Sequence, residues 1–319
     1  MNLSYISMDL SDRSIEEIQI LVGMKDENLI QIEEAFNTSI VIRSHELKVE
    51  ETENVSQVLL VIQKCFELID IHRKLPKQDV HYLIQLAQNH RLKSFKADQL
   101  APVSKTKSGK VIYPKTLGQA VLCDAFRSND IVFATGVAGT GKTYLAVAYA
   151  VNELKNERID KIILTRPAVE AGESLGFLPG DMKEKVDPYL RPLYDALFEM
   201  LGQETTERFI EKQIIEIAPL AFMRGRTLNN AIVILDEAQN TTKSQMKMFL
   251  TRMGQKTKMI INGDATQIDL IKKNDSGLVQ ATQILKNIRG IGMVHLEASD
   301  VVRHPLVQKI IECYAKIEN

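Results

Sequence analysis

Eight residues near the middle of the chain, 136–143, have the types and spacing of a loop that binds phosphate, the Walker A motif. Their sequence is Gly-Val-Ala-Gly-Thr-Gly-Lys-Thr. The glycines let backbone N–H groups turn toward one anion, Lys142 can reach the outer phosphates, and the Thr143 hydroxyl can bind Mg²⁺. The pattern predicts a nucleoside triphosphate as ligand. The residues expected to contact it are Gly136, Val137, Ala138, Gly139, Thr140, Gly141, Lys142, Thr143 and Tyr144.

Two adjacent carboxylates, Asp236 and Glu237, directly follow the apolar run of residues 231–235. An acid at the end of such a strand holds Mg²⁺ through water in phosphate-loop enzymes, and we expect Asp236 to do so, together with Thr143. Glu237 is placed to orient and deprotonate an attacking water. Surface acids after a strand are common, so the upstream loop is what favours the catalytic interpretation.

A third polar group follows the apolar run of residues 258–262, where the chain continues Gly-Asp-Ala-Thr-Gln. Ligands of open α/β sheets bind at the carboxyl ends of strands, which would bring Asp264 and Gln267 to the same edge as the acids. We expect Gln267 to sense the γ-phosphate and its water, and Asp264 to support the metal or Gln267. Gly-Asp pairs also occur in ordinary turns, so this motif depends on the others.

Two further functions need side chains from elsewhere in the sequence. Gln119, 17 residues before Gly136, can both donate and accept a hydrogen bond, which suits the edge of adenine. A glutamine on a polar helix surface is the alternative. An arginine should stabilise charge on the transferred phosphoryl group. Arg303 is the first candidate and Arg166 and Arg252 are weaker ones, with a surface role or a phosphate contact as the alternative for each.

Short apolar segments that alternate with helical patterns must position these groups. The alternation begins at residue 116 and is typical of a parallel sheet with helices on both faces. The predicted fold class is therefore α/β, of the phosphate-loop NTPase type. The expected strands are residues 131–134, 161–165, 214–218, 231–235, 258–262 and 292–296.

The region before residue 96 predicts a separate, small α+β domain. Strand patterns there cover residues 18–22, 40–43 and 46–49, and helical patterns cover 26–36, 55–71 and 80–87. Residues 103–113, centred on Ser108-Gly109, predict a basic β-hairpin. The predicted domains are 1–95, a hairpin connector at 96–115, and the nucleotide-binding domain at 116–319.

Composition is that of an ordinary globular protein, with 45% hydrophobic and 25% charged residues in a chain of 319. No apolar run approaches the ~20 residues that span a bilayer, and the start of the chain lacks a signal-peptide pattern. Three widely spaced cysteines form no ligand pair and indicate reduced packing residues. We therefore expect a cytoplasmic protein without a membrane partner.

The net charge of −1 conceals an uneven distribution. Residues 1–70 contain 14 acidic and 5 basic side chains, whereas residues 71–115 contain 10 basic and 2 acidic ones. A basic segment beside a nucleotide-binding core suggests contact with nucleic acid. Charge alone favours the other interpretation, a solvated face that balances the acidic domain.

Together these motifs resemble the PhoH-like family of bacterial ATPases over about residues 110–319. The family's core is similar to the first motor domain of superfamily one helicases. That likeness implies a RecA- or helicase-like sheet, ATP and Mg²⁺ as cofactors, Gln119 near adenine, and Gln267 as the γ-phosphate sensor. It also implies that residues 170–191 form an insertion facing nucleic acid or a neighbouring subunit. The segments that carry the resemblance are Pro114–Gln119, Gly136–Thr143, Thr165–Pro167, Phe222–Thr227, Leu235–Asn240, Gly263–Leu270 and Asp300–Pro305.

The chain departs from the family pattern in two places. Ile271 stands where the family usually has proline, and we expect little effect on ATP chemistry. The N-terminal region resembles the KH-like domain of longer members, but the turn at residues 23–26 lacks the second glycine of an RNA-clamping Gly-x-x-Gly loop. The region is also net acidic, which repels phosphate. We expect it to contact protein, and RNA to contact the hairpin and the loops of the core.

The leading hypothesis is an ATP hydrolase that acts in RNA metabolism, and the resemblance points to ribosomal RNA processing or RNA remodelling with an endoribonuclease partner. Since the chain has length for one motor domain, the arginine must come from its own late segment or from a neighbouring subunit, so we expect a homo-oligomer, such as a ring. The alternative is a nucleotide-gated scaffold that recruits an endoribonuclease with little turnover. A small-molecule kinase fits less well, because no acceptor-binding lid is evident.

Overall fold

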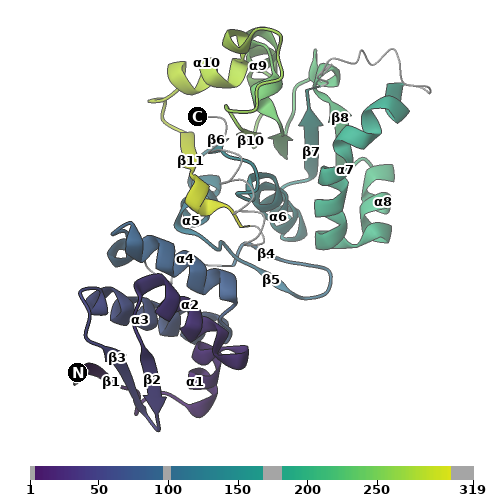
Figure 1. The fold of residues 1–319 in the computed structure, drawn as a ribbon. Coiled ribbons are helices and arrows are strands. Elements are labelled where there is room, and N and C mark those ends of the chain that lie inside the picture. The colour runs from purple at the N-terminus through teal and green to yellow at the C-terminus, as the bar shows by residue number, and fades with distance from the viewer. Residues whose placement is uncertain (1–3, 96–101, 168–181, 303–319) are drawn as a thin grey trace. The chain divides into compact units, whose positions relative to one another are not determined.

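The computed structural model describes residues 4–95, 102–167 and 182–302. The chain divides into two compact units, residues 1–100 and 101–319 (Figure 1). None of the described helices combines the length and apolar character that a bilayer span requires.

The first unit is α+β and contains a three-stranded antiparallel sheet with the strand order β1-β3-β2. Helices cover the sheet and bury apolar side chains such as Leu47 and Val49 of β3 and Ile62 of α3. Its elements are β1 (Tyr5–Asp9), α1 (Ile15–Val22), η1 (Met24–Asp26), α2 (Glu27–Phe36), β2 (Ile40–Arg43), β3 (Glu46–Glu50), α3 (Val55–His72), α4 (Lys77–Gln88) and η2 (Leu92–Ser94).

The strand expected at residues 18–22 was wrong, because these residues belong to helix α1. Ser14 caps the helix by accepting the Glu17 N–H, and the Glu17 side chain accepts the Ser14 N–H in return. This capping box outweighs the strand preference of a short β-branched run, which cannot be told from a helix by its apolar residues alone. The first strand of the sheet is instead β1, which the sequence pattern missed.

The second unit contains a six-stranded parallel sheet with the order β11-β6-β10-β9-β7-β8. All six expected strands are present, within two residues at each end, and the α/β fold class is confirmed. The four inner strands are nearly continuous apolar runs, as expected for strands covered on both faces. The strands are β6 (Ile131–Gly136), β7 (Lys161–Arg166), β8 (Ile215–Pro219), β9 (Ala231–Leu235), β10 (Lys258–Gly263) and β11 (Ile291–Leu296).

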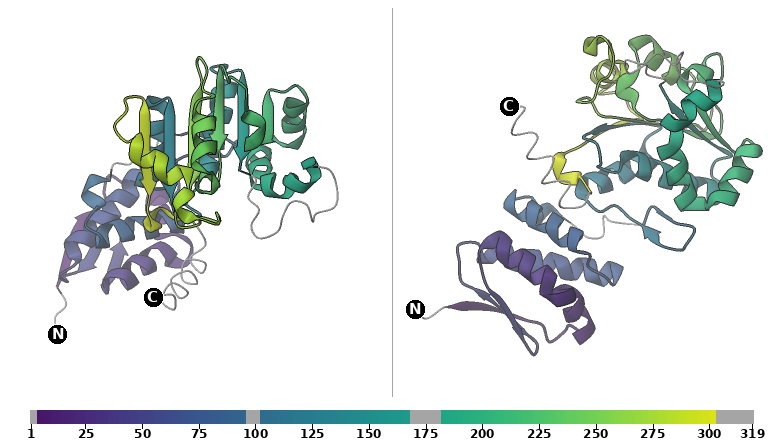
Figure 2. Two further views of the ribbon diagram at one scale, coloured as in Figure 1. Left: turned by 90° about the horizontal axis from the view of Figure 1, so that it is seen from above. Right: turned by 45° about the vertical axis from the view of Figure 1, so that its right-hand side comes forward.

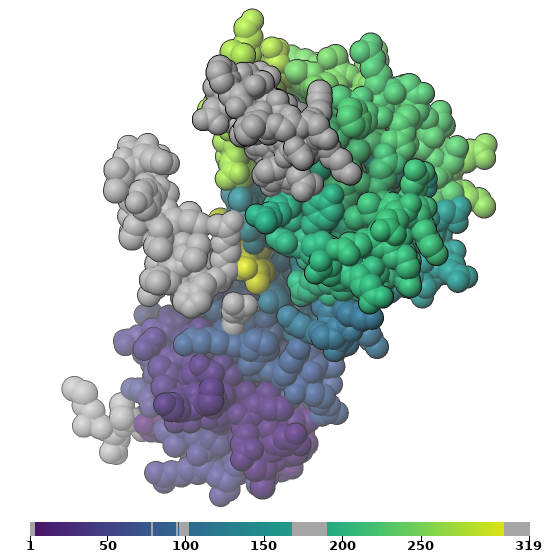
Figure 3. All heavy atoms as spheres, turned by 90° about the vertical axis from the view of Figure 1, so that its right-hand side faces the viewer, coloured from purple at the N-terminus to yellow at the C-terminus, as the bar shows by residue number. Residues whose placement is uncertain are grey.

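Helices cover both faces of this sheet (Figure 2). Apolar side chains of α5, α6 and α7 fill one core layer, and those of α9 and α10 fill the other. Figure 3 views the side of the unit on which α7 and α8 form the surface. The remaining elements are α5 (Leu117–Ser128), α6 (Lys142–Lys155), α7 (Met182–Leu201), α8 (Gln203–Glu211), η5 (Leu220–Met223), η6 (Ala238–Asn240), α9 (Lys243–Leu250), η7 (Lys273–Asp275), α10 (Gly277–Ile284) and η8 (Ala298–Asp300).

The predicted hairpin is formed by β4 (Ser104–Lys105) and β5 (Val111–Ile112), which pair antiparallel. Val103 and Ile112 are buried in the core layer of α6 and α7. The Lys107 N–H donates to the Glu199 carbonyl at 3.1 Å. The hairpin therefore packs as part of the second unit.

Candidate active site

The phosphate loop joins β6 to α6 at the carboxyl edge of the sheet, in the strand–loop–helix setting that the motif requires. Gly141, directly before α6, has φ +81°, a left-handed conformation that glycine adopts without strain. Gly136 has φ +132° and lies against the carbonyl oxygen of Leu296, where a Cβ atom would not fit. The free N–H groups at the start of α6 and the positive end of its dipole therefore face the space that this loop encloses.

Lys142 is buried, with 8% of its surface exposed. Its Nζ donates to the carbonyls of Gly136 and Val137 at 2.7 and 2.8 Å, and to Thr140 Oγ1 at 3.2 Å. Burial lowers the pKa of the ammonium, and the carboxylates of Asp264, Asp236 and Glu237 oppose that shift. The cation is therefore held inside the loop and faces the acids of the site.

The two predicted acids lie at the carboxyl end of β9. Asp236 accepts the Thr143 hydroxyl at 2.5 Å and Arg166 Nε at 3.0 Å, and Arg166 Nη2 also donates to Glu237 at 2.7 Å. Burial raises the pKa of the Asp236 carboxyl, while the charge of Arg166 and the Thr143 hydroxyl oppose the rise. Arg166 reaches both acids because β7, which it ends, lies directly beside β9.

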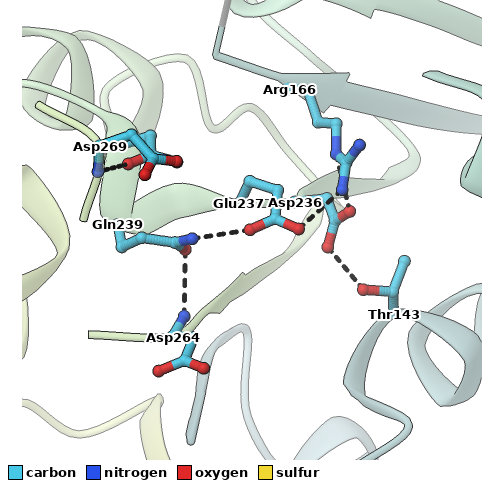
Figure 4. A network of polar contacts seen from close by, with 8 residues as sticks. Thr143, Arg166, Asp236, Glu237, Gln239, Asp264 and Asp269 are labelled. Carbon is cyan, nitrogen blue, oxygen red and sulfur yellow. Dashed lines mark hydrogen bonds and ion pairs between the residues drawn. The ribbon is translucent and has the colours of Figure 1, made fainter. Parts of the chain in front are cut away.

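The second carboxylate oxygen of Glu237 is also held by a hydrogen bond. Gln239 Nε2 donates to Glu237 Oε2 at 2.7 Å, and Gln239 Oε1 accepts the Asp264 N–H at 3.0 Å (Figure 4). Asp264 Oδ2 in turn accepts the Ala138 N–H of the phosphate loop at 3.0 Å. Glu237 itself has φ +53°, a left-handed conformation that costs a non-glycine residue about 1 kcal/mol. A continuous chain of contacts therefore runs from the loop to the acid expected to act as base.

These residues line an open pocket of about 530 Å³, a volume typical of ligand sites. Gln267 lies in its wall, and so does Tyr144, whose hydroxyl donates to Glu199 at 3.0 Å. Burial raises the pKa of the Tyr144 phenol, and Glu199 adds to the rise. The lining comprises Ala138, Gly139, Gly141, Lys142, Thr143, Tyr144, Arg166, Pro192, Asp195, Ala196, Glu199, Asp236, Glu237, Gly263, Asp264 and Gln267.

Gln119 is buried behind the loop and does not belong to this lining. Its Oε1 accepts the Lys115 N–H at 2.7 Å and its Nε2 donates to the Thr140 carbonyl at 2.9 Å. The side chain therefore supports the phosphate loop. Contact between Gln119 and adenine stays a prediction.

The three arginine candidates differ in position. Arg166 lies in the site. Arg252 lies at the opposite, amino edge of the sheet, because it comes shortly before the start of β10. It donates to the carbonyls of Met248 and of Arg226, which comes shortly before the start of β9. Arg303 lies outside the described residues, as does most of the predicted insertion at 170–191. The preceding residue, Val302, donates its N–H to the Gly139 carbonyl at 3.2 Å.

The donor set at the acids suits Mg²⁺. Thr143 Oγ1 and Asp236 Oδ1 are hard oxygen ligands that already lie 2.5 Å apart. Magnesium is typically bound by one or two protein oxygens together with phosphates and waters. The described residues contain no group of three or more acidic, histidine or cysteine side chains that would form a complete protein cage. The residues present therefore fit the ion through the two positions predicted for it.

Three features of the site were not assigned from the sequence. Arg166 was a weak candidate for a different role, and Gln239 stood inside the Asp-Glu-Ala-Gln motif without a role of its own. The wall supplied by α7, with Asp195 and Glu199, has no motif that marks it. The sequence signal that could have identified Gln239 is its position two residues after Glu237.

A family model described as PhoH-like protein matches residues 111–315. A PhoH-like protein of Bacillus subtilis is 52% identical over 98% of this chain and 98% of its own. A PhoH-like protein of Synechocystis is 45% identical over 96% of this chain and 94% of its own. Among solved structures, the Pif1 helicase of Candida albicans is 14% identical and covers 61% of this chain and 42% of its own, with a TM-score of 0.32, too low to carry an argument.

Proposed function

The chain belongs to the PhoH-like protein family, and from this premise we propose that it binds and hydrolyses ATP and acts in RNA metabolism. The support for hydrolysis is the fixed arrangement of a phosphate loop, a paired Thr143 and Asp236, and an oriented Glu237 in one pocket. The RNA role, with an endoribonuclease partner, rests on the family resemblance.

Binding uses the loop and its lysine. The N–H groups at the start of α6 and the Lys142 ammonium would hold the β- and γ-phosphates. Thr143 and Asp236 would hold Mg²⁺, which when bound neutralises phosphate charge. For the ligand to be held this way, Lys142 exchanges its contacts with the Gly136 and Val137 carbonyls for phosphate oxygens.

Glu237 is the residue proposed to activate water. Its side chain is 41% exposed and lines the pocket, so a water can reach it. Gln239 and Arg166 each engage one of its oxygens, which leaves a lone pair on each oxygen for the water. General-base catalysis by a positioned carboxylate contributes about 10²- to 10⁴-fold. This fixation of Glu237 is the observation that carries the proposal.

Release of inorganic phosphate from ATP by the purified chain tests it, with and without RNA. We expect turnover that Glu237→Gln lowers at least about a hundredfold while nucleotide binding remains. Turnover by Glu237→Gln at the wild-type rate would refute the role of this residue. Phosphate transferred to a small molecule would instead identify a kinase.

The alternative is a nucleotide-gated scaffold that recruits an endoribonuclease with little turnover. Arg166 favours it, because its guanidinium already holds one Glu237 oxygen in an ion pair, so that a single lone pair of that oxygen stays open to water. Full binding of ATP with no measurable phosphate release, in the presence of RNA, would select this function.

A homo-oligomer, such as a ring, and Arg303 as the phosphate-facing arginine complete the proposal. The Val302 contact with Gly139 supports supply of this arginine by the same chain. The assembly state is tested separately, by measuring mass against dilution.

A further inference from the structure

The short helix η5, which directly follows β8, carries an exposed aromatic side chain. Phe222 is 57% exposed and is the only phenylalanine among the described residues with a mostly open side chain. Leaving a large apolar side chain in water forgoes about 2 kcal/mol of burial. A single exposed apolar side chain is ordinary by itself, so the charge around Phe222 is what points to a partner.

The loop that carries Phe222 is firmly anchored. Its neighbours Leu220 and Met223 are buried in the core at 1% and 0% exposure. The Arg226 guanidinium donates to both oxygens of Glu216 at 2.5 and 2.7 Å, and Arg252 donates to the Arg226 carbonyl at 3.2 Å. Phe222 is thus held outward on fixed backbone, so little conformational entropy is lost when a partner packs on it.

The same surface is basic. Residues 220–227 and α9 contain four basic and no acidic side chains, and of the four Arg226 is paired with Glu216 of β8. Helix α9 packs directly against η5. Arg224, Lys243 and Lys247 are exposed there, and Lys243 has a long contact of 3.8 Å with Asp275. We call Phe222, Arg224, Lys243 and Lys247 the η5–α9 surface.

We propose that the η5–α9 surface binds single-stranded RNA. Phe222 stacks on a base, while Arg224, Lys243 and Lys247 contact phosphates. An exposed aromatic side chain among cations is the combination that binds single strands without sequence preference. This inference rests on the proposed role in RNA metabolism. It places the RNA site on the η5–α9 surface, and not on the basic hairpin or the N-terminal unit.

The surface is also linked to the candidate active site. Strand β8 runs into η5 and pairs with β7, where Pro219 is in register with Arg166. Arg166 bonds both Asp236 and Glu237. RNA on the η5–α9 surface therefore lies one strand away from the residue that positions the acids, and we expect bound RNA to change ATP turnover.

The test measures binding of fluorescently labelled oligouridine by anisotropy, with oligodeoxythymidine of equal length to distinguish RNA from DNA. We expect Phe222→Ala to weaken RNA binding about tenfold and Phe222→Trp to retain it, because stacking needs only an aromatic face. The plot of log affinity against log salt concentration has a negative slope. Arg224→Gln and Lys247→Gln should each make this slope shallower by about 0.7, because each removes one phosphate contact. Basal ATP turnover without RNA should stay at the wild-type value in all four variants.

Ile288→Ala combined with Arg289→Gln is the matched control, because it also removes an exposed apolar group and an arginine, but at the amino end of β11. It should bind RNA like the wild type. If Phe222→Ala and Arg224→Gln bind RNA as tightly as the wild type, the η5–α9 surface is not the RNA site, and the RNA role of the protein remains. Absence of RNA binding by the wild type would overturn both, and tighter binding of the DNA probe would reassign the surface to DNA.

Discussion

Gln239 and Glu237 are joined by a hydrogen bond of 2.7 Å, and Gln239 also accepts the backbone N–H of Asp264. Gln239 is 1% exposed and is not among the residues that line the pocket, so we expect it to act by positioning Glu237 and the Asp264 backbone. It therefore connects the acid at the end of β9 to the end of β10, and Asp264 extends the connection to the phosphate loop.

Gln239→Leu should lower the ATP turnover number about ten- to a hundredfold while the dissociation constant for ATP changes little, because Glu237, the proposed base, loses its orientation and the phosphate contacts remain. Phosphate release and equilibrium nucleotide binding measure the two quantities. Gln280→Leu, at an exposed position of α10, is the control. Equal loss of binding and turnover would mean that Gln239 supports the fold of the site and not the base.

Thr143→Ala should raise the Mg²⁺ concentration for half-maximal nucleotide binding about tenfold, because the hydroxyl is one of two protein ligands proposed for the ion. Thr143→Ser keeps the hydroxyl and should restore most of the affinity. Titration of Mg²⁺ against a fluorescent ATP analogue measures the effect without turnover. The same midpoint in wild type and Thr143→Ala would remove this residue from the metal site.

The sequence predicted the sheet well because each parallel strand is an apolar run that ends in a polar loop. The phosphate loop, Asp236 and Glu237 followed from local motifs. The contacts of Arg166 with both acids did not, because they depend on strand order: β7 brings Arg166 to Asp236 and Glu237 only because it flanks β9. Helix α1 was missed for a different reason, since its capping box competes with a β-branched segment that matches a strand equally well.

The free energy of unfolding of the wild type, measured relative to that of Asp236→Asn, should fall as pH rises. Burial raises the folded-state pKa of Asp236 above its ordinary value of 3.8, so folding favours the protonated carboxyl. Its contribution to stability is complete below 3.8 and is lost as pH increases through the raised folded-state pKa. Denaturant unfolding of both proteins at several pH values measures the difference. A difference that grows with pH would show that Arg166 and Thr143 outweigh burial.

Arg303→Ala should reduce ATP turnover about 10³-fold with near-normal nucleotide binding, the effect expected of an arginine that acts on the transferred group. The Val302 contact with Gly139 predicts that each chain supplies its own arginine. Mixing Arg303→Ala with Lys142→Ala protein should therefore restore no activity. Recovery of turnover in the mixture would place the arginine in a site of the neighbouring subunit.

Arg166→Met should abolish turnover and, wherever Asp236 is charged, destabilise the protein by about 3–5 kcal/mol, because it removes the cation that pairs with this buried carboxylate. The two partners have side-chain exposures of 15% and 5%, so water compensates little of that charge. Arg158→Met is the control: Arg158 pairs with Glu153 at similar distance, but its side chain is 56% exposed, so its loss should change stability little. Arg166→Lys separates charge from geometry. It should recover most of the stability and little of the turnover, since an ammonium cannot hold both acids with the planar guanidinium geometry. Full turnover by Arg166→Lys would mean that the positive charge alone is needed, and that the hydrogen bond to Glu237 does not orient the base.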